Sequence, residues 1–371
     1  MSLYSFFHLS KSEVNLGDSG SRGGSDDTAT CNTSDVPAGD LDHCVLFAFI
    51  KMRIARNAGR IEDCIKIIEK VLDEHGKKEW MKELNQILKH DISWCKMAQM
   101  KFASAGKMLM ELHELSRWSK LKNFYPALLT QGVRMNNDSP NSELADFLKK
   151  VNELKKAKVN SGNQQEMFCQ SRACLILETL QLQSKAKTKN DRYISDKDLV
   201  HKVCEILLYE CTFHWGFFPR AFTQENLQKK VMPCLKSMEG DRDFDSLSQF
   251  LQGSVHRYLN NFDDAEKALL VAKEAKLCHK RLKLVQAYAC IELAYVFIQK
   301  VESKDPRANE ENKIVEGEEI SGYLSDAKKM RGNYDMDQRI QFLVHNFTKT
   351  GDELWTSSKN KNSLAVPKHA V

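Results

Sequence analysis

The chain has 371 residues, of which 42% are hydrophobic and 28% are charged, with a net charge of +5 and a pI near 8.5. This composition supplies enough apolar surface for a sizeable core. It is too polar for a membrane-embedded protein and too weakly basic to indicate a nucleic-acid partner. Only seven prolines and seventeen glycines interrupt the chain, and this scarcity favours long helices over a many-turned sheet protein.

Residues 1–40 are predicted to form a disordered leader, because the run SGSRGGSDDTAT and its neighbours offer too little apolar surface to offset the entropy of ordering. The leader lacks the basic segment and the cleavage site of a secretory signal, and no run approaches the roughly 20 apolar residues that span a bilayer. Helical periodicity then recurs along the chain. The predicted helical segments are 43–75, 80–115, 143–158, 165–183, 196–213, 224–238, 246–276, 279–302 and 318–350.

The segment 247–275 has the spacing of two antiparallel helices joined by a tight polar turn. Gly253 leaves room for the partner helix, and Asn260 with Asn261 suits the turn. This spacing is typical of a tetratricopeptide repeat. The second helix carries a close-packed apolar face, made of Ala265, Leu269 and Ala272.

The same register recurs elsewhere. Near the start of the predicted fold, Gly59 marks a turn between a stripe made of Ala48, Met52 and Ala55 and a stripe made of Cys64, Ile68 and Val71. A weaker unit contains Phe102, Ala105, Leu109 and Leu112. A further unit is split by an acidic interruption and contains Cys290, Leu293, Ala294, Phe297, Ile320, Leu324 and Ala327.

Such units cannot bury their apolar faces alone and must stack on one another. We therefore predict an all-α fold, a tetratricopeptide-like α-solenoid of stacked antiparallel helix pairs over residues 41–355. An insertion loop is expected at 303–318, where DPRANEENKIVEGE breaks one repeat, and a flexible tail is expected at 356–371.

The sequence carries no recognised catalytic or cofactor motif: no glycine-rich phosphate loop, no HExxH and no GxSxG. The eleven cysteines include no CxxC pair, and on apolar stripes they act as small hydrophobes. His201 and Glu205 have i, i+4 spacing without a third ligand, and Cys169 near Glu166 is better explained as part of a core helix. We therefore predict a protein that is not an enzyme and uses no cofactor or metal. The odd number of cysteines favours a reducing, cytoplasmic compartment.

The densest basic patch consists of Lys149, Lys150, Lys155, Lys156 and Lys158. A run of charges on a helix is usually a solvated face. The alternative is an acidic partner or an anionic membrane surface, near which each basic residue adds roughly 1 kcal/mol of attraction.

Several motifs, in one order over residues 43–350, resemble the tetratricopeptide repeat protein 39 family, which is related to fungal inclusion-body clearance proteins. They are ARNAGRIEDCIKIIEKVLDEHGKKEW, ISWC, ELSRWSKLKNFY, EILLYECTFHWGFF and KKMRGNYDMDQRIQFLVH. The residues that carry the match are Trp118, Ser119, Lys120, Tyr209, Trp215, Tyr334 and Arg339. Family members have a longer folded region ahead of the first repeat seen here, so the match is to their C-terminal part. Pro126 falls within an expected helix, and it predicts a kink or a helix start near Asn123.

The resemblance implies a non-enzymatic helical adaptor or scaffold with protein partners, in the cytosol or at mitochondrial and lipid-droplet surfaces. By the same resemblance, the groove positions of the repeats hold Phe49, Arg53, Phe250, Ser254 and Tyr295. These residues do not form a carboxylate clamp; they fit an apolar groove closed by a helix or by the chain itself, or else the core between repeats. The alternative function is that of a peripheral membrane factor in lipid handling or inclusion clearance. Self-association would be one way to cap the stack.

Overall fold

A computed structural model of the protein describes residues 44–115, 120–159, 162–186, 196–276, 279–303, 310–330, 336 and 338–348. The chain divides into two compact units, Met1–Lys82 and Glu83–Val371, and each is described by itself. The predicted leader at 1–40 and the predicted tail at 356–371 lie outside the described residues.

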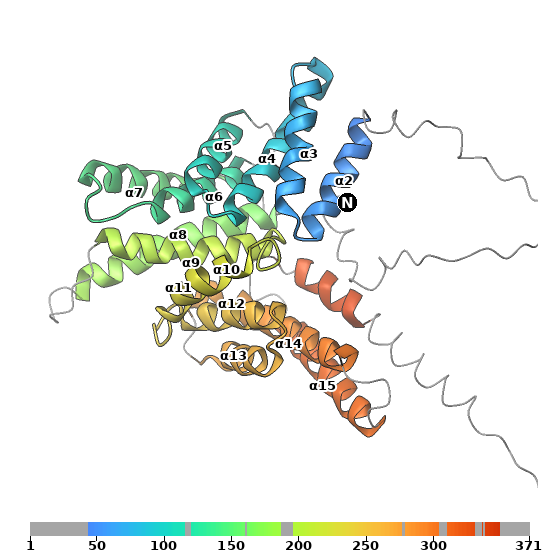
Figure 1. Cartoon of the computed structure of the whole chain (residues 1–371). Coiled ribbons are helices and arrows are strands. Elements are labelled where there is room, and N and C mark those ends of the chain that lie inside the picture. Colours follow the sequence, from blue (N-terminus) through green and yellow to red (C-terminus); the bar gives the residue numbers. More distant parts are fainter. Residues whose placement is uncertain are drawn as a thin grey trace, which may run out of the picture. The chain divides into compact units, whose positions relative to one another are not determined.

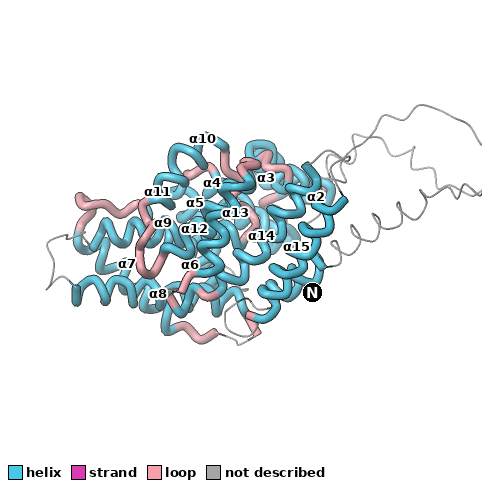
Figure 2. The backbone as a smooth tube through the Cα atoms, turned by 90° about the horizontal axis from the view of Figure 1, so that it is seen from below, coloured by secondary structure: helices cyan, strands magenta, loops and turns pink. Residues whose placement is uncertain are grey.

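All regular secondary structure in the described ranges is helical, and Figure 2 shows these helices joined by loops and turns, as predicted for an all-α fold. The first unit contains α2 (Val45–Asn57), α3 (Ile61–His75) and η4 (Glu79–Met81). The next helices are α4 (Lys82–Ala98), α5 (Phe102–Leu115), α6 (Lys120–Val133), α7 (Asn141–Lys156), α8 (Gln164–Ala186) and α9 (Asp196–His214). They are followed by α10 (Gln224–Asn226), η5 (Leu227–Val231), α11 (Met232–Lys236), α12 (Asp245–Tyr258) and α13 (Phe262–Glu274). The last elements are η6 (Lys280–Leu282), α14 (Leu284–Ser303), α15 (Glu310–Lys329) and a helix over 338–348.

Helices that are neighbours in sequence pack against each other as pairs. The closest pairs are α2 with α3, α5 with α6, α12 with α13, and α14 with α15. Within the second unit, Figure 1 shows α12 beside α13 and α14 beside α15. The predicted tetratricopeptide-like stacking of helix pairs is therefore confirmed.

Three pairs of consecutive helices, α2–α3, α4–α5 and α12–α13, are joined by the same turn. Gly59, Met100 and Asn260 all adopt the left-handed conformation, with φ of 73°, 60° and 62°. In each turn the N–H of this residue donates to the carbonyl three residues back, and the next N–H donates to the carbonyl five residues back. These two bonds form a Schellman motif, which satisfies the last carbonyls of the first helix. A new helix begins two residues after each of them, at Ile61, Phe102 and Phe262.

The second helix of each of these three pairs buries the same positions, namely the fifth, ninth and twelfth residues after the left-handed turn residue. The buried side chains are Cys64, Ile68 and Val71 in α3, Ala105, Leu109 and Leu112 in α5, and Ala265, Leu269 and Ala272 in α13. The repeat register predicted from the sequence is thus confirmed. Gly253 has the predicted role as well, since a Cβ atom on it would lie 2.5 Å from Leu269 Cγ.

Polar side chains of one helix cap the end of the helix before it. Gln170 of α8 donates through Nε2 to the carbonyls of Lys155, at 2.9 Å, and Ala157, at 2.8 Å, at the end of α7. Gln286 of α14 does the same at the end of α13, with distances of 3.2 and 2.9 Å. These amides satisfy carbonyls that have no partner within their own helix. The pairs α7–α8 and α13–α14 are therefore tied together by hydrogen bonds as well as by helix packing.

One prediction about local structure was wrong, and one alternative of a second was not met. The insertion loop predicted at 303–318 includes residues 310–318, which lie in α15, and residues 304–309 lie outside the described part. For Pro126 the prediction was a kink or a helix start near Asn123; the described part of α6 begins three residues earlier, at Lys120, and the kink stays a prediction. Almost every residue of α6 from Asn123 to Val133 is buried. This packing outweighs the penalty of about 3 kcal/mol for an interior proline.

In the described part of the chain, one segment, Lys280–Lys300, has the length and composition of a membrane-crossing helix. Most of its apolar window is buried inside the protein, as is common for a core helix.

Candidate functional site

The groove residues predicted on α12 are buried. Phe250 is 1% exposed and packs edge-on against Phe213, with ring centroids 4.8 Å apart. Ser254 is fully buried, and its hydroxyl donates to the carbonyl of Phe250 at 3.1 Å. Neither side chain offers a surface to a partner, so their assignment to a groove is corrected. They belong to the core between helices, because α12 is covered by neighbouring helices on several sides.

The predicted groove residues of the first unit lie on α2. Arg53 is mostly buried, and its guanidinium carbon lies 4.9 Å from the centroid of the Phe49 ring, while Phe49 itself is half-buried. This contact is a cation–π pair within one helix. It orders the arginine stem along the ring and leaves part of Phe49 accessible.

Tyr295 on α14 contacts a later helix of the same chain. Its ring meets Phe347 edge-on, with centroids 4.1 Å apart, and the Arg257 guanidinium lies 5.0 Å from its centroid on another side. Arg257 in turn is paired with Glu292 at 2.7 Å. The one groove residue of the second unit that remains half-buried is thus in contact with the helix over 338–348.

The helix over 338–348 has two polar anchors. Arg339 donates through Nη1 to the backbone carbonyl of His214, the last residue of α9. The backbone N–H of Gln338 donates to Oε1 of Gln164 at the start of α8, at 3.3 Å. Arg339 was predicted from the sequence as a family-motif residue, and its contact gives it a definite role, which is to attach this helix to the end of α9.

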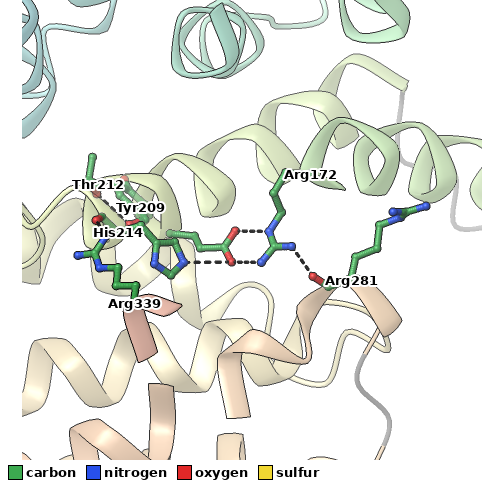
Figure 3. Close-up of polar contacts among 7 residues, drawn as sticks. Arg172, Tyr209, Thr212, His214, Arg281 and Arg339 are labelled. Carbon is green, nitrogen blue, oxygen red and sulfur yellow. Dashed lines mark hydrogen bonds and ion pairs between the residues drawn. The ribbon is translucent and has the colours of Figure 1, made fainter. Parts of the chain in front are cut away.

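At the end of α9, an ionic cluster is completely buried: Arg172, Glu210 and His214, called here the buried polar cluster (Figure 3). Arg172 from α8 donates to both carboxylate oxygens of Glu210 on α9, with Nε–Oε2 at 2.7 Å and Nη2–Oε1 at 2.6 Å. His214 Nε2 lies 3.8 Å from Glu210 Oε1 on the other side of the carboxylate. A two-pronged pair of this kind fixes both the distance and the rotation between two helices.

The protonation states of the cluster follow from its surroundings. Burial by itself would raise the pKa of Glu210, but the Arg172 charge and the hydrogen bonds from Arg172 and His214 outweigh it and lower the pKa to about 2. Burial lowers the pKa of His214 to about 4, against the opposing effect of Glu210. At neutral pH the cluster therefore holds one positive arginine, one negative carboxylate and a neutral imidazole.

The cluster also joins elements that are far apart in sequence. Arg172 donates through Nη1 to the backbone carbonyl of Arg281 in η6, and the Arg281 side chain pairs with Glu178 of α8 at 2.8 Å. Aromatic rings surround the pair: the Arg172 guanidinium lies 4.6 Å from the Phe168 centroid, and the His214 ring lies 5.0 Å from that of Tyr288. All formal charges in the cluster are paired, so it is suited to holding helices together rather than to chemistry.

A second polar chain runs along α9. Tyr209 donates to Glu205 Oε1 at 2.8 Å, and His201 Nε2 lies 3.4 Å from Oε2 of the same carboxylate. Burial would raise the pKa of Glu205, but hydrogen bonds from His201, Tyr209 and Cys234 lower it. Burial also raises the pKa of the Cys234 thiol, with the Glu205 charge adding to the effect. This thiol is a hydrogen-bond donor to a carboxylate, which is the opposite of an activated nucleophile.

The other cysteines singled out from the sequence are also unsuited to reaction. Cys169 is fully buried, and burial, followed by the Glu166 charge, raises the pKa of its thiol. Burial raises the pKa of Cys290 to about 12. Within the described ranges, no group of three or more His, Cys, Asp or Glu side chains is placed to hold a metal ion.

Two of the seven family-motif residues are buried packing residues. Trp215 stacks on Trp94, with ring centroids 5.3 Å apart, and Tyr209 is fully buried against Phe222. Lys120 is exposed at the start of α6, where its carbonyl lies 3.2 Å from His113 Nδ1. Three others lie outside the described residues, namely Trp118, Ser119 and Tyr334.

The predicted basic patch occupies the outer side of α7 and the residues that follow it. Its exposed members are Lys149, Lys155, Lys156 and Lys158. Lys150 is half-buried and pairs with Asp146 at 2.7 Å. Lys149 and Lys156 are seven residues apart, and so they lie on one side of the helix, opposite the buried stripe of Phe147, Val151 and Leu154.

One apolar surface was not predicted from the sequence. Along α2, four large side chains are exposed at helical spacing: Leu46 (67%), Phe47 (40%), Ile50 (46%) and Ile54 (54%). We call them the α2 stripe. They lie on a different side of α2 from Met52 and Ala55, which are buried. The signal was present in the sequence, since VLFAFIKMRIA is apolar on more than one side of a helix.

The buried polar cluster was also missed. Arg172 and Glu210 each interrupt an otherwise apolar helical stretch, CQSRACLIL and ILLYECTF, and a charge in such a place is the signal that could have found them. Their pairing depends on how α8 packs on α9, which one sequence does not state.

Comparison with known proteins gives one family. The sequence profile described as Iml2/Tetratricopeptide repeat protein 39 matches residues 41–259, which is more than half of the chain. No solved structure matches the chain.

Proposed function

Because the chain belongs to the Iml2/Tetratricopeptide repeat protein 39 family, we propose that it is a non-catalytic adaptor or scaffold that binds other proteins. Stacked helical repeats present extended surfaces, and such proteins generally work through partners. Two features support this function: the charges of the buried polar cluster are paired, and the thiols considered as nucleophiles are held in their protonated form. The proposed location is the cytosol, with mitochondrial and lipid-droplet surfaces as places where a partner would recruit the protein.

The observation that carries this proposal is the α2 stripe. A cluster of large exposed apolar side chains at helical spacing is costly to leave in water and commonly marks a contact with another protein. Leu46, Ile50 and Ile54 follow one another at intervals of four residues, so they form a continuous ridge along one side of α2. A ridge of this kind fits into the groove of a helix that crosses it.

We expect the occupant to be an amphipathic helix of a partner protein. The apolar stripes on α3 and α13, whose residues recur at intervals of four and three, are each covered by the helix they pack against, α2 and α12. The α2 stripe is the continuation of the same kind of packing on the free side of a repeat. Lys51, which lies within this stretch of α2, places its ammonium 5.8 Å from the centroid of the Phe47 ring.

A site-specific photo-crosslinking experiment tests this function. A photoreactive phenylalanine analogue replaces Ile50 in the full chain, and Val271, an exposed apolar residue of α13 at 48% exposure, receives the same analogue as a control. We expect the Ile50 position to crosslink to a protein that can then be purified and bound in a defined ratio, through an amphipathic helix identified by peptide mapping. Leu46→Asp should abolish that crosslink. Crosslinks from Ile50 to lipid alone, or the same products from Val271, would contradict the adaptor function.

The lysines of α7 favour a second candidate function, that of a peripheral factor at an anionic membrane surface that takes part in lipid handling or inclusion clearance. Four exposed lysines on and just after one helix present a concentrated positive surface. Each contributes roughly 1 kcal/mol of attraction near anionic headgroups at low ionic strength. Such binding weakens as salt is raised, because the charges are exposed.

Vesicle sedimentation tests this second function. The full chain is mixed with vesicles that contain phosphatidylserine, and Lys149→Glu with Lys156→Glu is compared with the control Lys107→Glu with Lys276→Glu, which reverses two exposed lysines elsewhere. We expect binding to fall more than tenfold for the α7 variant and to change little for the control. Equal losses for both variants would show that only net charge matters and would exclude a specific role for α7.

A further inference from the structure

The helix over 338–348 contacts the rest of the chain along one apolar side. Ile340, Leu343, Val344 and Phe347 are buried, whereas Phe342, His345 and Thr348 on the other sides are exposed. The buried positions follow the spacing i, i+3, i+4, i+7. This is the pattern with which an amphipathic helix binds in a groove of another protein.

The surface beneath this helix is assembled from three separate elements. It is defined here by Gln164 of α8, His214 of α9 and Tyr295 of α14, and we call it the helix-receiving surface. Arg339 is bound at the C-terminal end of α9, where the carbonyls and the helix dipole favour a cation. Phe347 lies against Tyr295 eight residues further along, so the contacts extend over the length of the helix.

The helix-receiving surface is held in place by contacts that do not involve the helix. Arg172 and Glu210 join α8 to α9, and Arg257 and Glu292 join α12 to α14. If the helix leaves, Glu210 keeps Arg172 as its partner, and no buried charge loses its counterion. The surface can therefore remain folded when the helix is absent, unlike a core from which one partner of an ion pair is removed.

The fit of the chain's own helix is incomplete. Gln341 Nε2 is buried and has no hydrogen-bond acceptor in the described part of the chain. A buried amide without a partner weakens the association of the helix. A helix that carried an apolar residue or a shorter side chain at this position would bind the same surface more tightly.

We propose that the helix-receiving surface is a binding site for an amphipathic helix of a partner protein, and that residues 338–348 occupy it in the absence of that partner. The partner helix carries an arginine followed by apolar residues at +1, +4, +5 and +8, as Arg339 is followed by Ile340, Leu343, Val344 and Phe347. This inference deepens the adaptor function, because it names the kind of partner, but it concerns a surface other than the α2 stripe.

The test uses the full chain and a labelled peptide of residues 336–350. In the variant Leu343→Asp with Phe347→Asp, the internal helix loses two of its apolar contacts and should vacate the surface. We expect the peptide to bind this variant at least tenfold more tightly than it binds the unchanged chain, where the tethered helix competes at a high effective concentration. Fluorescence anisotropy measures both affinities. Peptides with Arg339→Ala or Val344→Asp should lose binding, and Phe342→Asp, on the exposed side, should not.

Circular dichroism and thermal melting establish whether the variant is folded. A folded variant that does not bind the peptide would overturn the proposal. If the variant unfolds, hydrogen exchange in the unchanged chain decides instead: amides of 340–347 should exchange by local opening, at least tenfold faster than those of α9. If the amides of 340–347 and of α9 both exchange only by global unfolding, the helix over 338–348 is part of the core and the proposal is overturned. Dimers of the unchanged chain that dissociate in the variant would assign the surface to a second copy and overturn the partner proposed here. Any of these failures would leave the crosslinking test at Ile50 unaffected.

Discussion

The hairpins α2–α3 and α12–α13 share a turn and an internal register, yet the outer sides of their first helices differ. Gly59 and Asn260 close the two turns with the same hydrogen bonds, and the second helices bury equivalent positions. In α12 nearly every residue from Ser246 to Val255 is buried, whereas α2 exposes the α2 stripe. The local pattern therefore determines how a hairpin closes on itself, but the neighbours determine which of its outer surfaces are available for binding.

The largest effect is expected on the buried side of this comparison. Arg172→Met leaves Glu210 charged and without its partner in a fully buried site, and it should lower the free energy of unfolding by about 3 to 5 kcal/mol. Arg172→Met with Glu210→Met removes both charges and should recover most of this loss. Urea denaturation of the two variants and of Glu210→Met measures the coupling. Equal destabilisation by the single and double variants would mean that the pair does not act as a unit.

Acid should destabilise the second unit through His214. Its pKa in the folded protein is about 4, below the ordinary value of 6.5, so the unfolded chain binds a proton that the folded chain excludes. Stability is unaffected above pH 6.5 and falls as the pH drops from 6.5 to 4, by up to about 3 kcal/mol in total. In His214→Gln this part of the pH dependence should disappear. Denaturation at several pH values measures the slope, and an unchanged slope in the variant would assign it to other groups.

Gly253 tests whether the close approach of α12 to α13 is a property of that hairpin alone. A Cβ atom there would lie 2.5 Å from Leu269 Cγ, so Gly253→Ala should destabilise the protein by about 1 to 3 kcal/mol through overpacking. The corresponding position of the first hairpin, seven residues before its turn, holds Met52, which is buried without such a conflict. Leu269→Ala should relieve part of the strain in the Gly253→Ala background, as measured by thermal melting. If the effects of Gly253→Ala and Leu269→Ala on stability are purely additive, the added methyl group does not clash with Leu269.

The turns should respond in opposite directions to substitution. Gly59→Ala forces a side chain into the left-handed conformation at a φ of 73° and should cost about 1 kcal/mol. Asn260 is exposed and already adopts a φ of 62°, so Asn260→Gly should gain only a few tenths of a kcal/mol. Thermal melting of Gly59→Ala, of Asn260→Gly and of Asn260→Ala, which places alanine at the second turn, provides the comparison. A loss with Asn260→Gly would mean that its side chain has a role in the turn.

The smallest effect is expected at the α2 stripe. Leu46→Asp and Ile50→Asp alter exposed side chains, so the stability of the isolated protein should change by less than about 0.5 kcal/mol. The same change at Leu251 of α12 serves as the control and should destabilise the protein clearly, because it buries a carboxyl group. Urea denaturation of each purified variant measures its free energy of unfolding and distinguishes the α2 variants from Leu251→Asp. A large loss at Ile50 would indicate that the stripe is covered within the folded chain rather than available to a partner.

The parts of the fold that depend on local spacing were predictable. The register of the second helices was predicted correctly from the small residues Cys64, Ala105 and Ala265 and the larger apolar residues that follow them. An α-helix that packs on a neighbour must repeat its apolar face every three to four residues. The acidic run before Ile320 was read as a loop because it lacks this apolar face. Its glutamates and lysines nevertheless favour a helix, and residues from Glu310 onward form one.

The surfaces were harder to predict than the hairpins. Phe250 was placed in a groove by its position in the repeat, but whether that position faces a groove or another helix depends on packing between repeats, which the spacing within one repeat does not contain. Tyr295 was also assigned to a partner groove, and its ring contacts Phe347 of a helix in the same chain. The pairing of Arg172 with Glu210, 38 residues apart, likewise depends on the arrangement of whole helices.

The hydrogen bonds by which one helix caps the end of the helix before it have a consequence for folding during synthesis. The last carbonyls of α7 find their donor in Gln170, and those of α13 find theirs in Gln286, more than ten residues further along the chain in each case. On the ribosome, the end of each of these helices therefore stays hydrated until the following helix has emerged from the exit tunnel. Synthesis from the N-terminus then completes these two helix ends only when α8 and α14 emerge, and each of these helices stabilises the one made before it.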